Sequence, residues 1–468
     1  MRLLISAAHK SSGKTTVTLG LCAALRRRGL AVQPFKKGPD YIDPMWLALA
    51  SGRPCYNLDF YLMSEEEVRG LFASRSAGAD ITLIEGNKGL YDGLALDGSD
   101  SNAALAGLLG APVVLVIDTR GMTRGIAPLL LGYQDFGPSL RFAGVVLNRT
   151  GGDRHEAKLR AAVEEYTDMR VLGAVREHAD MAIVERHLGL MPSNETDEAA
   201  RIISRIADRI AGETDLDALI DAAHSSAAEP IAASAPPAPP ARRDLRIGIL
   251  RDAAFGFYYP DDLEALEHCG AQLVAIDALR DSRLPPVDGL FIGGGFPEAR
   301  MNGLEANAAF RNAVREAVDS GLPVYAECGG LMYLSRAIRW RGERREMVGA
   351  IAGETVMHAR PRGRGYVRLR ETGASPWPLR GPDGELAEFP AHEFHYSGLD
   401  DLEVEYPYAF DILRGHGVDG RHDGIVHRNT LACYVHQRDV GGNAWTRRFT
   451  DFVRRVKNER RHAAGITG

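Results

Sequence analysis

Two segments of this chain combine residue types that can do chemistry. The first, A-H-K-S-S-G-K-T-T over Ala8–Thr16, follows an apolar run at Leu3–Ser6 and opens a helix expected over Thr15–Arg28, which Gly29 would end. A glycine-bearing loop before a helix N-terminus turns backbone N–H groups toward an anion. We therefore expect a phosphate site formed by Lys10, Ser11, Ser12, Gly13, Lys14, Thr15 and Thr16. Lys14 would reach the outer phosphates, and the Thr15 hydroxyl would bind Mg²⁺.

The phosphate loop departs from the usual pattern at its start. Ala8 stands where the first glycine is usual. P-loop switch and partitioning ATPases carry a signature lysine directly after that position, which here is His9, with Lys10 one place later. A switch ATPase with an appended binding domain is therefore the less favoured alternative, and it would lack glutaminase activity.

Three carboxylates follow the ends of expected strands near this loop. Asp40 and Asp43 lie in K-K-G-P-D-Y-I-D-P after the strand at Ala31–Phe35, and Glu85 ends the strand at Ile81–Glu85. Parallel sheets bind ligands at the carboxyl ends of their strands. We expect these carboxylates to hold a metal ion or substrate beside a magnesium–nucleotide site.

The second chemical segment is L-P-V-Y-A-E-C-G-G, which places Cys328 after an apolar strand and before two glycines. A thiol on such a strand-to-helix turn is a candidate nucleophile, because the helix N-terminus favours the thiolate and backbone N–H groups can stabilise an oxyanion. His436, which follows the run Leu431–Val435, is the best candidate for the base. The predicted oxyanion donors are Gly294, Gly295 and Gly329.

Bulk composition indicates an ordinary soluble protein. Of 468 residues 45% are hydrophobic and 25% charged, and the net charge of −6 disfavours nucleic acid as the main partner. The five cysteines are scattered, which disfavours a disulfide framework and fits a reducing cytoplasm. No apolar run approaches the ~20 residues of a membrane span, and we expect the N-terminus to run directly into the first strand without a leader.

Apolar runs alternate with helical patterns on both sides of one biased segment. Residues 224–244 are rich in Ala, Pro and Ser, which predicts a linker. Short β-branched runs with helices between them predict parallel, doubly wound α/β sheets. We expect domains at 1–223 and 245–460 and a tail at 461–468. The further expected strands are Val113–Asp118, Gly144–Asn148, Val171–Val175, Arg246–Leu250, Gln272–Ile276, Gly289–Ile292 and Pro323–Ala326.

These motifs carry a family resemblance that covers nearly the whole chain. A-E-C-G-G, the turn G-G-G-F-P-E and His436 resemble a class I glutamine amidotransferase domain. The N-terminal half resembles the dethiobiotin-synthetase-type P-loop fold. The two in this order, with K-K-G-P-D-Y-I-D-P and A-H-E-F-H-Y-S, closely resemble the cobyrinic or hydrogenobyrinic acid a,c-diamide synthase family.

The resemblance implies a cytoplasmic ligase that uses ATP and Mg²⁺ to activate carboxyl groups of a corrin-like tetrapyrrole. Ammonia from L-glutamine would then displace the phosphate. It is also compatible with a homodimer. Because Q-R-D-V-G-G-N after His436 departs from the more apolar ending of the cobyrinate enzymes, a sirohydrochlorin or sirohaem amidase of the same superfamily is an alternative. A non-catalytic tetrapyrrole-binding chaperone is a third reading.

The sequence leaves some roles open. Many class I enzymes carry the third, acidic member of the catalytic group two positions beyond the histidine, but here Gln437 and Arg438 follow His436, so Asp439 or Glu393 could orient it. Arginine binds carboxylates bidentately, so the strip at 358–366 is either a macrocycle contact or a solvated loop. A-H-E-F-H-Y-S is expected to form a turn in the glutamine or macrocycle pocket. The candidate substrate residues are Tyr41, Arg360, Arg362, Arg364, His392, Glu393 and His395.

Overall fold

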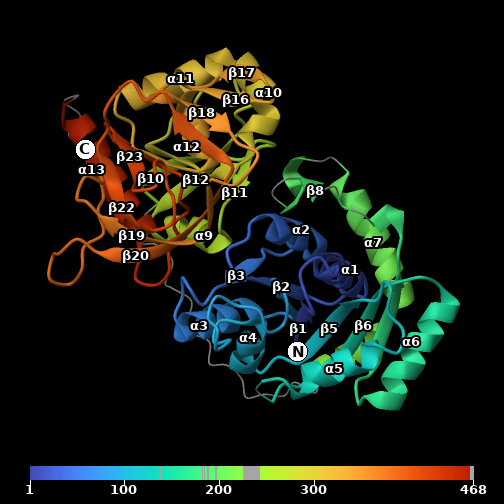
Figure 1. The fold of residues 1–468 in the computed structure, drawn as a ribbon. Coiled ribbons are helices and arrows are strands. Elements are labelled where there is room, and N and C mark those ends of the chain that lie inside the picture. The colour runs from blue at the N-terminus through green and yellow to red at the C-terminus, as the bar shows by residue number, and fades with distance from the viewer. Residues whose placement is uncertain are drawn as a thin grey trace. The chain divides into compact units, whose positions relative to one another are not determined.

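A computed structural model describes residues 1–463 apart from 138, 182, 184, 187, 188, 196, 197 and 225–242. The chain divides into two compact units, Met1–Pro236 and Pro237–Gly468 (Figure 1). Most of the expected linker, and residues 464–468 of the expected tail, lie outside the described residues. The last helix, α13, runs through Ala463 and so continues past residue 460, where the second domain was expected to end.

The N-terminal unit is built on a seven-stranded parallel sheet in the order β3-β2-β4-β1-β5-β6-β7. Its strands are buried on both faces, which explains their unbroken apolar character. The six strands expected from sequence are present, and the three-residue β3 was missed because it is too short for a periodic signal. The bounds are β1 Arg2–Ala7, β2 Val32–Lys37, β3 Tyr56–Leu58, β4 Ile81–Glu85, β5 Val113–Asp118, β6 Phe142–Thr150 and β7 Val171–Arg176.

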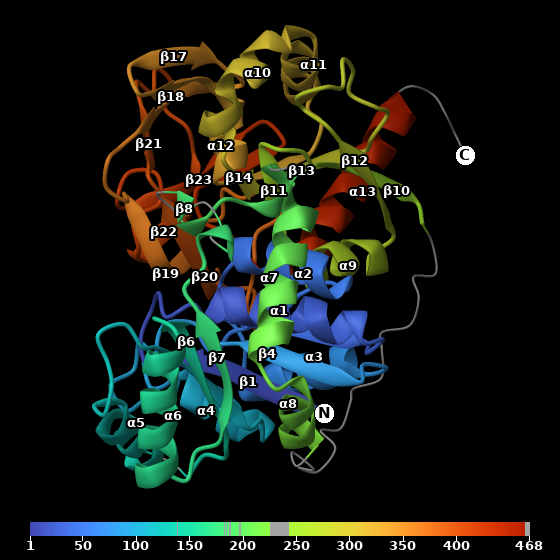
Figure 2. The same cartoon turned by 90° about the vertical axis from the view of Figure 1, so that its right-hand side faces the viewer.

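Helices cover both faces of this sheet, as right-handed crossovers require. The connections β1-α1-β2 and β2-α2-β3 move one way along the sheet, and those through α3–α6 move the other way, so the two sets lie on opposite faces (Figures 1 and 2). Helix α7 packs on α1 and α2. The bounds are α1 Lys14–Arg27, α2 Ile42–Ser51, α3 Glu65–Ser76, α4 Asn102–Leu109, α5 Ile126–Asp135, α6 Asp153–Tyr166, α7 Ala199–Glu213 and α8 Leu216–His224; short elements are η1 Ala179–Met181, β8 Glu185–Arg186, β9 Gly189–Leu190 and η2 Ser193–Glu195.

The C-terminal unit contains a nine-stranded mixed sheet in the order β12-β10-β13-β15-β24-β23-β22-β19-β20. The first five strands are parallel, and the last four continue it with antiparallel pairs. A smaller sheet has the order β17-β16-β18-β21. The bounds are β10 Leu245–Leu250, β11 Phe255–Phe257, β12 Ala271–Ile276, β13 Gly289–Ile292, β14 Gly294–Gly295, β15 Val324–Glu327, β16 Ser335–Trp340, β17 Glu343–Glu346, β18 Ile351–Met357, β19 Gly363–Glu371, β20 Glu388–His395, β21 Ser397–Asp400, β22 Tyr408–Arg414, β23 His422–His427 and β24 Thr430–Cys433.

Two apolar cores lie on the two faces of this larger sheet. In β15, Val324 and Ala326 join one core, whereas Tyr325 joins the other beside α13. This alternation follows from the two-residue period of a strand, and it fixes which face each residue near the end of β15 can reach. The helices are α9 Pro260–His268, η3 Pro297–Arg300, α10 Met301–Ala306, α11 Ala308–Asp319, α12 Gly329–Leu334 and α13 Trp445–Ala463.

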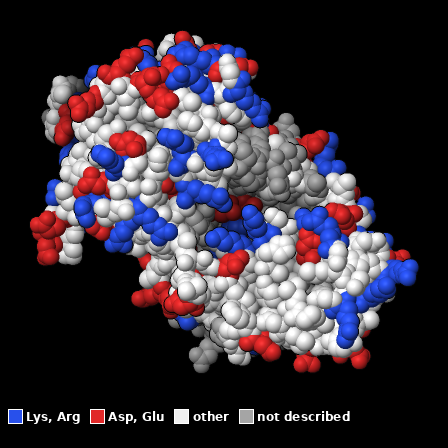
Figure 3. Space-filling model, in the orientation of Figure 1, with Lys and Arg blue, Asp and Glu red and all other residues white. Residues whose placement is uncertain are grey.

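The surface carries both signs of charge. The sequence has 56 Lys and Arg against 62 Asp and Glu, and the face in Figure 3 shows both interspersed over both units. Among the described residues, no helix has the length and apolar character that a membrane crossing needs. The expected architecture, a doubly wound parallel α/β domain followed by a second α/β domain, is confirmed.

Candidate active sites

The phosphate loop connects β1 to α1 in a conformation that only particular residues allow. Ser11 and Gly13 have φ of 63° and 90°, in the left-handed region. A side chain at Gly13 would also collide with Asn148, since a Cβ there would lie 2.1 Å from Asn148 Nδ2. That amide donates a 2.8 Å hydrogen bond to the Ser12 carbonyl. Position 13 therefore requires glycine both for its backbone conformation and because Asn148 occupies the space of a side chain. The hydrogen bond from Asn148 also holds the loop in place.

Lys14 lies at the start of α1 with its charge only partly compensated. Its Nζ donates to the Lys88 carbonyl at 2.5 Å and to the His9 carbonyl at 3.5 Å. Burial, and next the positive charge of Lys36, lower the pKa of Lys14 to about 8. A buried ammonium that faces carbonyl groups gains from an incoming anion. This is the environment expected of a phosphate-binding lysine.

The carboxylates of Asp43 and Glu85, which were expected to hold a metal ion or substrate beside the phosphate loop, converge on Thr15. The Thr15 hydroxyl lies 2.6 Å from Glu85 Oε1 and 3.3 Å from Asp43 Oδ2. Asp40 belongs to the same group, and burial beside Asp43 raises its pKa to about 7. Asp40 also accepts from the backbone N–H groups of Ile42 and Asp43 and so starts α2, where Tyr41 is buried.

Lys36 lies at the centre of this group and was not selected from the sequence. Its Nζ is 2.5 Å from Asp43, 2.9 Å from Glu85 and 3.7 Å from Asp40. Burial opposes its charge, but Asp43 and Glu85 more than offset this and raise the pKa of Lys36 well above its ordinary value. The signal was present in K-K-G-P-D-Y-I-D-P, where a lysine ends a buried strand beside two carboxylates.

The oxygens at this site fit a magnesium ion that is also bound by phosphates. Thr15, Asp43 and Glu85 offer hard oxygen donors, and within the described residues Glu85 Oε2 is buried without a hydrogen-bond partner. The described residues contain no group of three His, Cys, Asp or Glu arranged as a metal cage. Mg²⁺ commonly takes one or two carboxylates and completes its shell with water and substrate phosphates. The donor set is therefore incomplete without a nucleotide.

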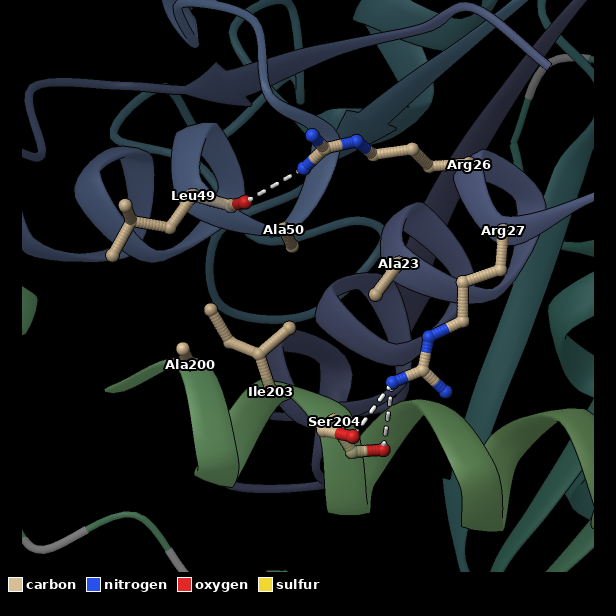
Figure 4. A pocket seen from close by; sticks show the side chains of 8 residues that line it. All are labelled: Ala23, Arg26, Arg27, Leu49, Ala50, Ala200, Ile203 and Ser204. Atoms are coloured by element: carbon tan, nitrogen blue, oxygen red, sulfur yellow. Dashed lines mark hydrogen bonds between the residues drawn. The ribbon is translucent and has the colours of Figure 1, made fainter. Parts of the chain in front are cut away.

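A separate pocket of about 340 Å³ lies between α1, α2 and α7 (Figure 4). Its arginines, Arg26 and Arg27, come from the last turn of α1, whereas the phosphate loop precedes the first turn. They donate to the Leu49 carbonyl and to Ser204. A 14-residue helix is about 20 Å long, so this pocket lies far from the phosphate loop. Its lining is Ala23, Arg26, Arg27, Leu49, Ala50, Ala200, Ile203 and Ser204.

Cys328 occupies a strained turn between β15 and α12. Its φ of 47° and ψ of −101° are unusual for a residue with a side chain. The turn is held by a 2.7 Å hydrogen bond from Cys328 N to the Cys433 carbonyl. A Cβ at Gly330 would lie 2.3 Å from the Ile292 carbonyl, so this position accepts only glycine without a shift. The geometry is that of a nucleophile elbow, as expected from A-E-C-G-G.

The expected oxyanion glycines lie next to this elbow. A Cβ at Gly329 would lie 2.9 Å from the Gly295 nitrogen, so the two turns pack closely. A Cβ at Gly294 would lie 2.7 Å from His436 Cε1. Gly294, Gly295 and Gly329 are therefore gathered around the Cys328–His436 pair, where backbone N–H groups could meet a developing oxyanion.

His436 forms a side-chain hydrogen bond with Cys328, and Glu327 lies on its other side. The distance from His436 Nδ1 to Glu327 Oε2 is 3.3 Å. Burial alone would lower the pKa of His436, but the hydrogen bonds with Cys328 and Glu327 outweigh it and raise the pKa to about 10. The environment thus favours an imidazolium beside the thiol, which is what a thiolate–imidazolium pair requires.

His392 supports His436 rather than lining a turn. A-H-E-F-H-Y-S was expected to form a turn, but Ala391–His395 belong to strand β20. The His392 ring stacks on His436 with centroids 4.9 Å apart and planes 15° apart, and their backbones form a β-bridge. Burial, and next the charges of His436 and Arg438, lower the pKa of His392 well below its ordinary value. His392 is therefore a neutral ring against the candidate base.

The two acids suggested as partners of His436 are engaged elsewhere. Glu393 accepts from the backbone N–H groups of His416 and Gly417, and its Oε2 lies 3.5 Å from His395. Asp439 accepts from the N–H and hydroxyl of Thr446. Both suggestions are wrong for the structural reason that neither side chain reaches the histidine. The carboxylate that does is Glu327, which the sequence shows directly before Cys328.

Arg360, Arg362 and Arg364 are exposed at the start of β19. None forms an ion pair with a side chain of the described residues, and Arg364 lies over the Phe394 ring, 5.3 Å from its centroid. By contrast, Arg368 and Arg370 further along the strand pair with Glu388.

Comparison with known proteins matches both units. A model of the CobQ/CobB/MinD/ParA nucleotide-binding domain matches residues 4–190, and a model of the CobB/CobQ-like glutamine amidotransferase domain matches residues 246–439. A cobyrinate a,c-diamide synthase of Magnetococcus marinus is 46% identical over 95% of each chain. Enzymes of the same name from Archaeoglobus fulgidus and Methanosarcina acetivorans are 39% and 40% identical over 96% and 94% of this chain, and over 96% and 92% of their own. The chain belongs to the cobyrinate a,c-diamide synthase family.

Proposed function

We propose that this chain amidates the a and c acetate side chains of cobyrinate, with ATP as activator and glutamine as nitrogen donor. The observation that carries the proposal is the presence of two complementary sites in one chain. One is an anion-binding loop beside clustered carboxylates, and the other is a Cys–His pair on a strained elbow. The names of relatives that match along nearly their whole length support the choice of substrate.

In the proposed glutaminase half, the Cys328 thiolate attacks the side-chain carbonyl carbon of glutamine. The N–H groups of the glycine turns stabilise the oxyanion, and His436 gives its proton to the departing nitrogen. A carbon–sulfur bond forms, the carbon–nitrogen bond breaks, and ammonia leaves. Water then hydrolyses the thioester, with His436 as base, and releases glutamate and the free thiol.

In the proposed synthetase half, a substrate carboxylate oxygen attacks the γ-phosphorus of ATP. ADP leaves, and an acyl phosphate results. The loop and Lys14 bind the phosphates and offset the developing charge. Thr15, Asp43 and Glu85 would hold Mg²⁺, which supplies further charge neutralisation when bound. Ammonia then attacks the acyl carbon, phosphate leaves, and the amide remains.

The arginines at the start of β19 are proposed contacts for the carboxylates of the macrocycle. Arg360, Arg362 and Arg364 are exposed and have no acidic partner among the described residues, unlike Arg368 and Arg370. Arginine suits this task because its planar fork matches a carboxylate. Hydrogenobyrinate, sirohydrochlorin and sirohaem present similar carboxylates and are the competing substrates.

Product analysis tests the proposal. The full chain is incubated with ATP, Mg²⁺ and glutamine together with cobyrinate, hydrogenobyrinate, sirohydrochlorin or sirohaem, and products are identified by mass spectrometry. A diamide from cobyrinate, formed only with ATP, is expected. If another macrocycle is amidated in preference to cobyrinate, the substrate assignment is wrong.

A companion variant separates the two halves. Cys328→Ala should abolish glutamine-dependent amidation and glutaminase activity, because the nucleophile is lost. It should retain amidation with added ammonium salt, because the synthetase site is unchanged. Failure of ammonium to rescue a folded variant would contradict the two-site mechanism.

A further inference from the structure

We propose that Glu327 is the acidic partner that orients His436, so that the catalytic group Glu327–His436–Cys328 takes its acid from the residue directly before the nucleophile. The inference rests on the proposed glutaminase function of Cys328 and His436. Glu327, at the end of β15, would thus be the third member of the catalytic group, after Cys328 and His436.

The Glu327 carboxylate is built into the site on three sides. Its Oε1 accepts from the Tyr325 hydroxyl at 2.5 Å and from the Gln437 backbone N–H at 2.9 Å, and its Oε2 faces His436 Nδ1 at 3.3 Å. The residue is only 2% exposed. A buried carboxylate with donors on each oxygen is fixed in place and largely insulated from solvent.

Strand geometry explains why the acid comes from this position. In β15, Tyr325 and Glu327 share one face because side chains alternate along a strand. β15 pairs in parallel with β24, with Glu327 opposite Cys433, so the chain after β24 passes the end of β15. His436 and Gln437 lie on that continuation. Cys328, one residue beyond Glu327, turns away at the elbow and approaches His436 from another side.

The position that commonly supplies the acid holds Arg438, which is committed to another network. Its guanidinium forms a 2.7 Å ion pair with Asp261 and lies over the Tyr259 ring. It is 2% exposed, so its side chain is fixed there. The acid that faces His436 comes instead from the end of β15.

The contact between Glu327 and His436 determines which ring nitrogen of the histidine carries hydrogen. A carboxylate oxygen accepts a hydrogen bond, so Glu327 selects the form with hydrogen on Nδ1 and leaves Nε2 for the Cys328 thiol. It also stabilises the imidazolium that forms when the thiol gives up its proton. The charged or titratable groups around the histidine are Glu327 and Cys328, the stacked neutral His392, and Arg438 beyond it.

The experiment compares Glu327→Gln with Asp439→Asn in the full chain. Asp439 is the matched control, since it is a partly buried acid near His436 in sequence that binds Thr446 instead. Glutaminase kcat and KM are measured from neutral to alkaline pH. The rate of Cys328 alkylation by iodoacetamide is followed over the same range, with Cys328→Ala as blank. Thermal unfolding followed by circular dichroism reports whether the C-terminal unit of each variant is folded.

Glu327→Gln should lower glutaminase kcat by about 100-fold and change KM little, because orientation and charge act on the chemical step. The alkaline limb of the kcat profile and that of the alkylation-rate profile should both move to lower pH. The reason is that a neutral amide at position 327 no longer stabilises the His436 imidazolium. Asp439→Asn should leave that limb in place. If kcat and the alkylation rate fell but the pH of their alkaline transition stayed the same, Glu327 would only support the fold, and the inference would be overturned.

Glu327→Asp covers the case in which the glutamine variant does not fold. It keeps the charge but shortens the side chain, so kcat should fall while the alkaline limb stays closer to that of the wild type. If the aspartate and glutamine variants behave alike, the charge at 327 has no role in His436 function. Glutaminase activity in Cys328→Ala would instead refute the underlying proposal, so the two failures are distinguishable.

Discussion

Two buried lysines in the N-terminal unit have opposite electrostatic environments although they belong to one site. Burial and Lys36 lower the pKa of Lys14 to about 8, whereas Asp43 and Glu85 raise that of Lys36 well above its ordinary value. Lys36 is therefore the counter-ion of three clustered carboxylates. Lys14 is the cation that remains available for phosphate.

Lys36→Met should destabilise the N-terminal unit, because it leaves Asp43 and Glu85 buried without their cation. Breaking a buried pair in this way costs about 3–5 kcal/mol of unfolding free energy. Mg²⁺ should restore part of the loss, since it binds the same carboxylates. Thermal unfolding with and without Mg²⁺ measures both effects. Lys158→Met, at an exposed lysine on α6, is the control and should show neither; an equally small effect at Lys36 would contradict the assigned role.

At the scale of elements, the elbow depends on close contact between two glycine turns. Gly330 follows the nucleophile at a point where a Cβ would lie 2.3 Å from the Ile292 carbonyl. Because that oxygen belongs to the strand β13, relief requires movement of α12 or of the sheet. The position of Cys328 is thus set by the packing of β13 against the start of α12.

Gly330→Ala should lower glutaminase activity more than it lowers stability, because a small shift of the elbow misplaces the thiol. A destabilisation of about 1–3 kcal/mol is typical of overpacking. Gly381→Ala is the matched control in the same unit, because its nearest contact would be 3.9 Å away. Glutaminase assays and chemical denaturation of both variants check this. Wild-type glutaminase activity in Gly330→Ala would show that the elbow tolerates the shift.

The strands that could be predicted from the sequence differ from those that could not in the burial pattern of their side chains. Strands buried on both faces, such as Val113–Asp118, are unbroken apolar runs and were found. In β19, buried Val367, Leu369 and Glu371 alternate with exposed Arg368 and Arg370, so the segment lacks an unbroken apolar run and was not predicted as a strand; the overlapping strip at 358–366 was interpreted as either a macrocycle contact or a solvated loop. Glu327 was overlooked for a related reason: only the pairing of β15 with β24 brings it to a histidine more than a hundred positions away.

At the scale of the whole molecule, the chain divides one reaction between two units with different requirements. The N-terminal unit gathers phosphate-binding groups and hard oxygen donors. The C-terminal unit brings together a thiol, an imidazole and a carboxylate. In the proposed mechanism, ammonia is the product of the C-terminal unit and a substrate of the N-terminal unit. The two halves should therefore respond differently when metal or nucleotide is removed.

Chelation should separate the halves without any mutation. In excess EDTA the full chain should lose ATP-dependent amidation with both glutamine and ammonium, because the phosphates and Thr15, Asp43 and Glu85 lose their shared cation. Glutaminase activity measured without ATP should persist, because the proposed reaction at Cys328 uses only groups of the protein. Glutamate release and amide formation are followed in parallel, and Mg²⁺ is then added back. If glutamate release without ATP also required Mg²⁺, the cation would act outside the phosphate site, and the division of chemistry between the two units would be wrong.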